Sequence, residues 1–454
     1  MNKLLLDALR CPYCSGEFTV THGNVSGDNW DYGVLSCYCE QYPVVAGIPV
    51  IRKGVIGNNG ETIQAVSQLI LSGKHQDALL ATLMPPAPAS AQLAPAWLEQ
   101  LPQVKGMWRL KGLFGRFAIS RWTERVQTLL ADGPIGKTAK DYVDVCFGVR
   151  GNEKSYDYFM NRFGQPRQLV ALSLMTLIES PRKPVLDFGC GFGHLTSHLV
   201  RRVGHQSIIG ADRDFIRLYV AKNILAPEAL YVCCDGDVSL PFPDEFFSVS
   251  YVSDALYMVT NKVICSREVQ RVADSNGIII VSGIRNRVAK FHYRAAMPYH
   301  AYGELFASVP HRVLANSDVL ARYLNKRGPA LSRSSEKRTL DDEQWFSIVA
   351  TNREELLVDQ AAFEDWPHAE GVLELNPLYK PAGDQANASG EILYRHAFPS
   401  SWYEREDGDC RNYEPESVSI SSQILKDLSS QKRTAEMEAL IARCVIVGIP
   451  DRFH

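Results

Sequence analysis

The sequence lacks the long apolar runs of a membrane protein. No stretch approaches the roughly 20 consecutive apolar residues that span a bilayer as a helix. The first ten residues contain Asp7 within their apolar part and show no basic segment followed by a cleavage site. We therefore expect neither a membrane span nor a signal peptide, and a cytoplasmic location follows by default.

An excess of one charge is also missing. The 454 residues include 48 Lys and Arg against 51 Asp and Glu, which gives a formal net charge of −3. Such a balance shows no global preference for a polyanion, although it leaves room for a local basic patch. The apolar content of 46% and the charged content of 22% are ordinary for a globular protein and exclude a wholly disordered chain.

The cysteines do not follow a disulfide pattern. Their number, eleven, is odd, and without an export signal reduced thiols are favoured. Four of them form two pairs, Cys11-x2-Cys14 and Cys37-x-Cys39, separated by 22 residues. Four thiolates on two short turns can complete a tetrahedral Zn²⁺ site, although the second pair is one residue closer than usual. We expect a structural zinc here; the alternative is four packed cysteines in a small core.

Changes in composition divide the chain into four regions. Residues 1–54 contain a short helix, a hairpin and the four cysteines, and residues 55–149 form a helical linker interrupted by prolines. Residues 150–352 alternate strands with helices, and residues 353–454 form an extension with weaker periodicity and a late helix at 430–444. We expect these boundaries to be those of a zinc-binding unit, a linker, an α/β domain and an extension of unknown role.

The alternation in the third region predicts an α/β fold. We expect strands at 185–188, 208–211, 230–234, 247–252 and 278–281, with helices at 194–203, 214–225 and 262–273. A further helix at 317–325 and strands at 331–335 and 345–350 can complete the sheet. Strands that alternate with helices in this way form a parallel sheet with helices on both faces.

Polar and glycine residues follow the first three of these strands. The segment 185–194 reads Val-Leu-Asp-Phe-Gly-Cys-Gly-Phe-Gly-His and opens a helix. Its Gly-x-Gly-x-Gly spacing lets a ligand approach the backbone closely at a helix N-terminus. Asp212 ends the second strand, where a carboxylate can accept both hydroxyls of a ribose, and Asp235-Gly236-Asp237 ends the third.

Together these residues resemble the class I S-adenosylmethionine-dependent methyltransferases over residues 150–352. The resemblance implies a Rossmann-like sheet and S-adenosylmethionine as cofactor. Its methionine end would lie against the loop formed by Asp187, Gly189, Cys190, Gly191 and Gly193, in which the Cys190 thiol is expected to pack. The ribose would be held by Asp212, and the adenine would contact Arg213 and one of Asp235, Gly236 and Asp237, with Ser253 on the floor of the pocket. Which of the two carboxylates meets the adenine stays open.

The first region resembles the small zinc-ribbon domain that occurs as a free-standing activator of some methyltransferases. The resemblance rests on Leu-Leu-x4-Cys-Pro-x-Cys, which starts at Leu5, and on Tyr-Pro-Val-x2-Gly-Ile-Pro-Val, which starts at Tyr42. It covers residues 1–54 and implies a zinc ribbon whose metal ligands are Cys11, Cys14, Cys37 and Cys39.

The acceptor is harder to assign. The stretch 285–315 follows the fifth strand and should face the cofactor, so its aromatic and imidazole groups are candidate catalytic residues: His292, Tyr293, Tyr299 and His300. The alternative is an insertion that packs on the C-terminal region. The segment 156–163, rich in aromatic residues, is a candidate acceptor lid.

Three functions are compatible with these patterns. We favour methyl transfer to a small-molecule or carrier-bound acceptor, and a homodimer is possible. A basic, aromatic stretch at 105–125 keeps methylation of ribosomal or transfer RNA possible, because a zinc ribbon before this fold also resembles some ribosomal RNA methyltransferases. A non-catalytic adaptor that binds a partner through the ribbon is the third.

Overall fold

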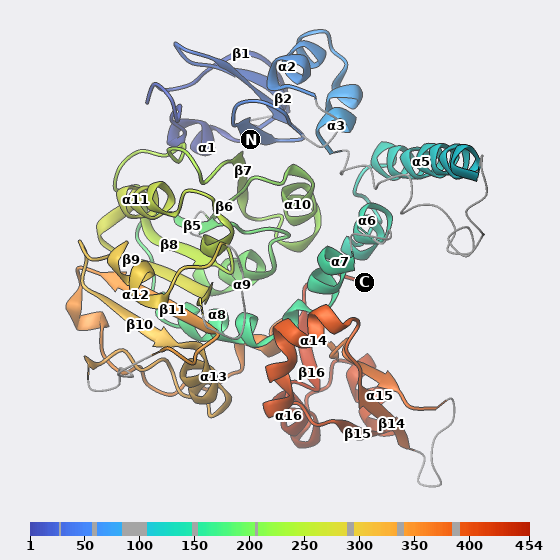
Figure 1. The fold of residues 1–454 in the computed structure, drawn as a ribbon, viewed down its shortest axis with the longest axis vertical. Coiled ribbons are helices and arrows are strands. Elements are labelled where there is room, and N and C mark those ends of the chain that lie inside the picture. The colour runs from blue at the N-terminus through green and yellow to red at the C-terminus, as the bar shows by residue number, and fades with distance from the viewer. Residues whose placement is uncertain are drawn as a thin grey trace.

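A large mixed sheet forms the centre of the molecule (Figure 1). The computed structural model describes residues 1–26, 29–56, 61–83, 107–147, 153–204, 208–287, 295–333, 340–383 and 391–454. Eleven strands follow the order β1-β2-β3-β4-β7-β6-β5-β8-β9-β11-β10, and two small sheets, β12-β16 and β13-β14-β15, belong to the C-terminal region. Among the helices of the described ranges, none is long and apolar enough to cross a membrane.

The ribbon contributes the first four strands of this sheet. It consists of α1 (Lys3–Ala8), β1 (Thr19–Ser26), β2 (Asn29–Ser36), β3 (Gln41–Val45) and β4 (Ile48–Ile51). Ala46 and Gly47 join β3 to β4 with φ angles of 48° and 75°, as a two-residue hairpin turn with two left-handed residues requires. β4 then pairs in parallel with β7, placing Val50 opposite Cys233. The ribbon therefore extends the central sheet instead of forming a sheet of its own.

Helices form most of the described part of the linker region, as the sequence predicts. They are α2 (Ile63–Leu71), α3 (His75–Leu83), α5 (Met107–Ala131) and α6 (Ala139–Cys146). Two further helices, α7 (Glu153–Met160) and α8 (Pro166–Met175), precede the first parallel strand. Thr62 caps the N-terminus of α2, because its hydroxyl accepts a hydrogen bond from the Ala65 N–H at 3.2 Å. The apolar side of α2 packs on the ribbon, where Ile63, Val66 and Ile70 are buried.

The parallel strands and their helices lie close to the predicted positions. The strands are β5 (Val185–Phe188), β6 (Ile208–Asp212), β7 (Leu230–Cys234), β8 (Phe247–Ser253) and β9 (Ala273–Arg285). Between them lie α9 (His194–Val203), α10 (Phe215–Val220), which continues as a π-helix over Ala221–Leu225, and α11 (Lys262–Val272). Helices lie on both sides of these strands (Figure 1), so their residues are buried on both faces.

The strand expected at 331–335 is absent from its described part, residues 331–333. The predicted helix at 317–325 and strand at 345–350 are present as α13 (Asn316–Leu324) and β11 (Trp345–Thr351), and β11 pairs antiparallel with β10 (His311–Ala315), a strand that was not predicted and that follows α12 (Tyr299–Glu304). Leu331 is buried, and its carbonyl accepts a hydrogen bond from Arg312 Nε on β10 at 2.8 Å. The stretch 285–315 therefore contains a helix and an edge strand.

The C-terminal region forms a lobe at the lower right of Figure 1. Its elements are β12 (Val372–Leu375), β13 (Tyr379–Pro381), β14 (Glu391–His396), α14 (Ser401–Asp407), β15 (Ser417–Ser421), α15 (Ser422–Ser429), α16 (Ala435–Ile441) and β16 (Ile446–Ile449). The late helix is shorter than predicted, because α15 ends before Gln431, which has a φ angle of 53°, and Thr434 caps a new helix. The chain then returns to α7, where Phe453 stacks on Phe159 at 4.7 Å between ring centroids.

Candidate active site

A cavity of about 690 Å³ lies beyond the carboxyl ends of β5, β6, β7 and β8. Ligands of open α/β sheets bind at this edge. Eight of the eleven predicted cofactor contacts line the cavity: Gly189, Gly191, Asp212, Arg213, Asp235, Gly236, Asp237 and Ser253. Asp187, Cys190 and Gly193 are not among the lining residues, and Cys190 is buried.

The glycine loop brings its backbone to the wall of this cavity. Gly189 has a φ of 75°, and a Cβ atom there would lie 2.4 Å from the Ala255 Cβ, so no other residue fits without displacement. A Cβ at Gly191, where φ is 55°, would meet no atom within 4 Å. The space beside Gly191 therefore belongs to the open cavity, where a ligand can approach the backbone.

Asp187 lies beneath the loop. Its side chain is buried, and its Oδ2 accepts a hydrogen bond of 2.6 Å from the Thr196 hydroxyl on α9. Burial raises the pKa of Asp187 to about 7; the Thr196 hydroxyl opposes this shift and the nearby Asp212 adds to it. In the protein without ligands, this carboxyl therefore titrates close to neutral pH.

This pKa predicts how stability depends on pH. The folded-state value lies above the ordinary 3.8, so the fold favours the protonated carboxyl, and the stability linked to it is lost as the pH rises towards 7. Relative to Asp187→Asn, the wild type should lose roughly 2–3 kcal/mol of unfolding free energy between pH 5 and pH 8. Urea denaturation of both proteins at the two pH values measures the difference. Parallel pH profiles would contradict the expectation.

Two backbone donors fix the carboxylate of Asp212 at the end of β6. The Gly191 N–H donates to Oδ2 at 2.9 Å and the Asp214 N–H donates to Oδ1 at 2.8 Å. Each oxygen keeps a further lone pair for a hydroxyl group in the cavity. Desolvation raises the pKa of Asp212, and the Arg217 cation and the two N–H donors oppose that shift. The orientation of the Asp212 carboxylate suits a ligand with two neighbouring hydroxyls.

The two carboxylates after β7 have different partners. Arg52, which follows β4, places its Nε 3.3 Å from Asp235 Oδ2 and donates a hydrogen bond of 2.9 Å to the Arg213 carbonyl. Asp237 instead accepts a hydrogen bond of 2.6 Å from the Asn261 N–H at the start of α11. Sequence reasoning missed Arg52, because nothing local to the ribbon indicates that its last strand lies beside β7.

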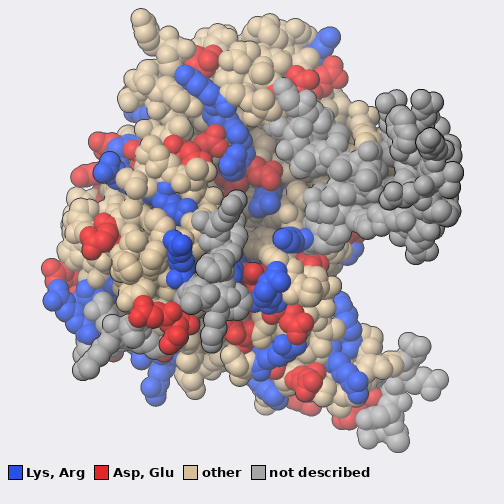
Figure 2. All heavy atoms as spheres, viewed as in Figure 1, with Lys and Arg blue, Asp and Glu red and all other residues tan. Residues whose placement is uncertain are grey.

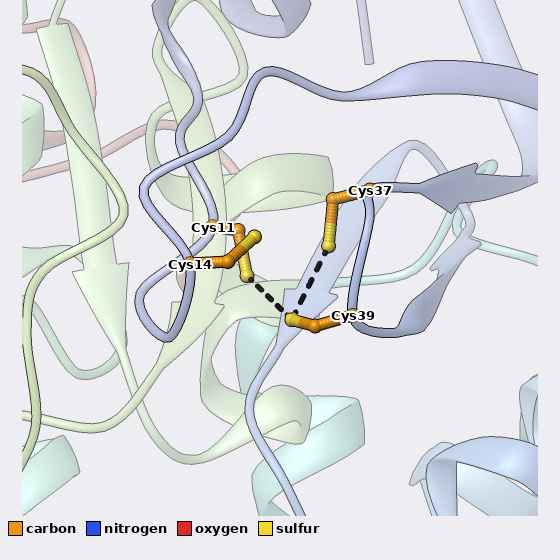
Figure 3. Close-up of side chains that lie close together, drawn as sticks. All are labelled: Cys11, Cys14, Cys37 and Cys39. Atoms are coloured by element: carbon orange, nitrogen blue, oxygen red, sulfur yellow. Dashed lines mark hydrogen bonds between the residues drawn. The ribbon is translucent and has the colours of Figure 1, made fainter.

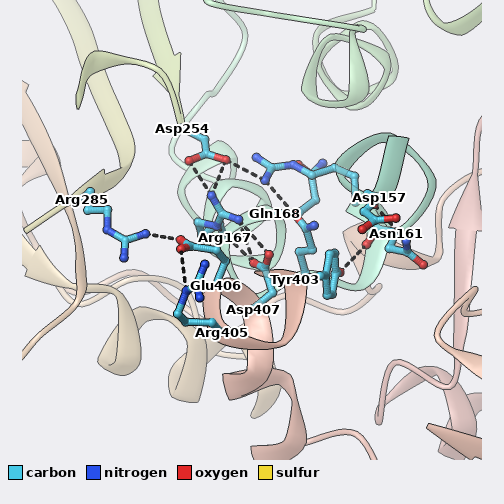
Figure 4. A network of polar contacts seen from close by, with 12 residues as sticks. Asp157, Asn161, Arg167, Gln168, Asp254, Arg285, Tyr403, Arg405, Glu406 and Asp407 are labelled. Carbon is cyan, nitrogen blue, oxygen red and sulfur yellow. Dashed lines mark hydrogen bonds and ion pairs between the residues drawn. The ribbon is translucent and has the colours of Figure 1, made fainter. Parts of the chain in front are cut away.

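A buried network of ion pairs joins this edge of the sheet to the C-terminal lobe (Figure 4). Asp254 follows Ser253 with a φ of 54° and accepts hydrogen bonds from Arg162 at 3.0 Å and Arg167 at 2.9 Å. The other end of the Arg167 guanidinium donates to both oxygens of Asp407 on α14, at 3.0 and 2.9 Å. Burial alone would lower the pKa of Arg167, but Asp254 and Asp407 outweigh it and raise the value.

Two further pairs extend the same network. Glu406, next to Asp407 on α14, pairs with Arg285 at the end of β9. The Tyr257 hydroxyl donates to Asp254 Oδ1 at 3.1 Å. Three segments far apart in sequence are thus held together by charge-assisted hydrogen bonds.

Aromatic and basic side chains complete the lining of the cavity. Tyr158 on α7 lies within the segment predicted as an acceptor lid, and Tyr257 and Met258 lie in the short helix Leu256–Met258. Trp402 comes from α14, with Lys154 Nζ 5.6 Å from its ring centroid. No sequence pattern indicated that Trp402, from the C-terminal region, would reach the cavity.

The four predicted catalytic residues are placed differently. Tyr299 and His300 lie on α12, with ring centroids 5.5 Å apart, and neither belongs to the residues that line the cavity. The Tyr299 N–H donates to Asn286 Oδ1 at 2.9 Å. His292 and Tyr293 lie outside the described residues. The catalytic role of these four residues stays a prediction.

The four ribbon cysteines converge (Figure 3). Their sulfur atoms all lie within 4.8 Å of one another, with 3.5 Å between Cys11 and Cys39 and 3.7 Å between Cys37 and Cys39. Sulfur atoms around a tetrahedral zinc are about 3.8 Å apart, given Zn–S bonds of about 2.3 Å. The arrangement fits the donor set that zinc requires.

Comparisons with known proteins agree with this geometry. Residues 186–281 match the family described as "Methyltransferase domain". The ubiquinone/menaquinone biosynthesis C-methyltransferase UbiE of Burkholderia multivorans is 28% identical over 32% of this chain and 60% of its own length. UbiE of Vibrio campbellii is 36% identical over 22% of this chain and 41% of its own length. The match thus spans between 41% and 60% of these relatives.

Two of the solved structures that match part of this chain are described as methyltransferases or their complexes. The structure described as the "complex between the Haloferax volcanii Trm112 methyltransferase activator and the putative methyltransferase" matches 44% of this chain and 95% of that chain, with 16% identity and a TM-score of 0.33. The TehB-like S-adenosylmethionine-dependent methyltransferase of Corynebacterium glutamicum matches 40% of this chain and 86% of that chain, with 16% identity and a TM-score of 0.30.

Proposed function

We propose that this chain transfers a methyl group from S-adenosylmethionine to a small-molecule or carrier-bound acceptor. The observation that carries the proposal is that the glycine loop and Asp212 line the same cavity. Both belong to the segment that matches a methyltransferase domain. Bound S-adenosylmethionine supplies an electrophilic methyl group on a sulfonium whose leaving group is neutral. The protein's task is then to align the acceptor and exclude water.

The cavity residues fit this cofactor. The open space beside Gly191 accommodates a ligand against the backbone, and the fixed carboxylate of Asp212 would accept the two ribose hydroxyls. Arg213 and the Asp235–Asp237 segment would surround the adenine. Since Asp237 holds the start of α11, Asp235 is the better candidate for the adenine amino group, and Arg52 would orient it.

The rest of the lining favours a small acceptor. Tyr158, Tyr257 and Trp402 offer flat apolar surfaces, and Lys154 adds one positive charge. This combination suits a planar molecule with an anionic or phenolic oxygen. The names of the two UbiE relatives, which describe methylation at carbon in quinone biosynthesis, agree with such an acceptor.

RNA is the weaker candidate. On the face shown in Figure 2, Lys and Arg side chains are interspersed with Asp and Glu instead of forming a continuous basic surface. Within the basic stretch predicted at 105–125, Arg121 and Arg125 are exposed on α5, but Trp122 is buried and its Nε1 donates to the Val145 carbonyl at 2.9 Å. The side chains before residue 117 lie outside the described part. The described part of the helix therefore has a packed face.

Trp402→Ala tests the acceptor wall. Loss of its ring should lower kcat/KM by about 10-fold or more, through roughly 1.5–3 kcal/mol of lost aromatic contact, while S-adenosylmethionine affinity changes less than twofold. Steady-state kinetics and calorimetry on the same preparations provide both values. Tyr299→Phe is the matched comparison, because it tests the stretch 285–315 instead. A loss in Tyr299→Phe alone would place the acceptor under that stretch.

We further propose that Cys11, Cys14, Cys37 and Cys39 hold one structural zinc. Thiolate ligation would contribute much of the ribbon's folding free energy. Because β4 belongs to the central sheet, the metal would also support Arg52 at the cavity. Cys37→Ser should remove one zinc per chain and lower the unfolding temperature. Metal analysis of the purified chain measures this; an unchanged zinc content would contradict the proposal.

The third function, an adaptor that acts only through the ribbon, can be distinguished from the two enzyme functions by measuring the affinity of the chain for S-adenosylmethionine. An adaptor has no need of S-adenosylmethionine, whereas either enzyme must bind it.

A further inference from the structure

The C-terminal lobe contains a second group of metal-binding side chains. His396 ends β14, Cys410 lies in the short helix Gly408–Asn412, and Glu414 follows that helix. The side chains of His396 and Glu414 are 4% and 0% exposed, and Cys410 is buried. One possible ligand atom from each of the three residues lies within 4.8 Å of the other two.

The geometry around His396 differs from that of a catalytic triad. Glu414 Oε2 lies 2.5 Å from His396 Nε2, and Cys410 Sγ lies 3.6 Å from the same nitrogen. In a triad, the acid contacts one imidazole nitrogen and the nucleophile contacts the other. Here both groups meet one nitrogen, which carries at most one proton. Three donor atoms that converge on one point are what a shared cation requires.

Distances and donor types point to zinc or a similar divalent ion. Bonds of about 2.0–2.2 Å to nitrogen and oxygen and about 2.3 Å to sulfur place neighbouring tetrahedral ligands about 3.3–3.6 Å apart. The Cys410–His396 distance already fits, and Glu414 would have to move away from His396 by about 1 Å. One imidazole, one thiolate and one carboxylate suit zinc better than magnesium or calcium. The two anionic ligands would balance its charge.

A neighbouring amide supports this arrangement. Asn376 Nδ2 donates at 2.9 Å to Glu414 Oε1, the oxygen that does not face His396. Asn376 is itself fixed, because Nδ2 also donates to the Cys444 carbonyl at 2.9 Å and Oδ1 accepts from the Leu378 N–H at 3.1 Å. Metal-binding carboxylates are commonly oriented by such second hydrogen bonds.

A small apolar cluster lies next to the candidate metal ligands. Beside the three-stranded sheet β13-β14-β15 lies a separate apolar cluster whose buried members are Leu378, Tyr403 and Cys410. Other parts of the lobe, such as Ile420 and Met437, belong to the main hydrophobic core, so a metal would add most to this small separate cluster. Cys410 belongs both to this cluster and to the candidate ligand set.

We propose that His396, Cys410 and Glu414 bind one zinc-type divalent ion, with a fourth position left for water. The ion would tie β14 to the segment that follows α14. Since α14 carries Trp402, Glu406 and Asp407, the ion would stabilise the helix that completes the cavity wall. This second metal site is separate from the ribbon zinc, and the ion would take no direct part in methyl transfer.

Metal analysis of the full chain tests the proposal. Cys410→Ala and Glu414→Gln should each lose one zinc per chain, and Cys37→Ser should still contain this zinc. Cys444→Ala is the matched control, because its thiol lies 3.8 Å from another buried imidazole, His368, and should keep the wild-type content. Zinc content unchanged in folded Cys410→Ala and Glu414→Gln would overturn the proposal and leave a buried His396–Glu414 ion pair.

A second measurement covers variants that fail to fold. Metal-free Cys37→Ser chain, prepared with a chelator, is titrated with Zn²⁺ against a competing chelator. One tight equivalent, with a higher unfolding temperature on binding, is expected from the lobe site and should be missing from Cys37→Ser/Cys410→Ala, which has the same three remaining ribbon thiols. Absence of any tight equivalent would overturn the proposal for the lobe. It would not bear on the proposed ribbon zinc, because the titrated chain lacks the ribbon ligand Cys37.

Discussion

Replacing Asp212 with alanine should weaken binding of S-adenosylmethionine by about ten- to a hundred-fold. The variant removes the charged acceptor of two ribose hydroxyls, and charge-assisted hydrogen bonds of this kind contribute about 1.5–3 kcal/mol. Each 1.4 kcal/mol corresponds to tenfold in the dissociation constant. Isothermal titration calorimetry measures the change directly.

Two controls make this result specific. Asp244→Ala removes a carboxylate whose side chain is 76% exposed and pairs with Arg271 outside the cavity, so cofactor affinity should be preserved. Asp212→Asn keeps the shape and one acceptor, and should bind with intermediate affinity. Equal affinities of wild type and Asp212→Ala would place the ribose site elsewhere.

Replacing Arg167 with methionine should produce the largest loss of stability, about 3–5 kcal/mol of unfolding free energy. Arg167 is the shared partner of Asp254 and Asp407, and all three side chains are at most 7% exposed. Methionine fills much of the same volume, so the cost comes mainly from the buried Asp407, which loses Arg167, and to a lesser extent from Asp254, which keeps Arg162. Urea denaturation at neutral pH measures it.

Matched variants separate charge from packing. Arg353→Met breaks an exposed pair with Glu355 and should cost at most about 1 kcal/mol. Adding Asp407→Asn to Arg167→Met removes one uncompensated carboxylate and should recover part of the loss. A loss below about 1 kcal/mol in Arg167→Met would show that solvent reaches the network and compensates it.

The parallel core could be predicted from the sequence because its signals are local. β7 is a continuous short apolar run, β5 is apolar apart from Asp187, and α9 begins directly after Gly193. The cavity lining could be predicted for the same reason, since Gly189, Asp212 and Asp235 each follow or end a strand of one parallel sheet. The four ribbon cysteines likewise met as their spacing predicted.

The remaining parts of the site depend on contacts between distant segments. Arg167 and Asp407 are separated by 240 residues, and Arg52 reaches Arg213 across 161 residues. No periodicity in the sequence encodes such pairs. The contribution of α14 to the cavity, through Trp402, could therefore not be predicted.

The stretch 285–315 shows a different difficulty. Its tyrosines and histidines suggested an acceptor loop, whereas four of these six residues belong to regular structure in α12 and β10. His311–Ala315 is a five-residue edge strand whose polar residues His311 and Arg312 mask its alternation. Aromatic residues at the end of a predicted strand do not by themselves distinguish a pocket from a packed edge.

The most direct test of the proposed function is methyl transfer itself. The full chain is incubated with S-adenosylmethionine labelled in its methyl group and a cell extract, with and without nuclease, beside Asp212→Ala. We predict label in a small-molecule or carrier fraction, unaffected by nuclease and strongly reduced in the variant. Label that appears in RNA and disappears with nuclease, or transfer no greater than with Asp212→Ala, would contradict it.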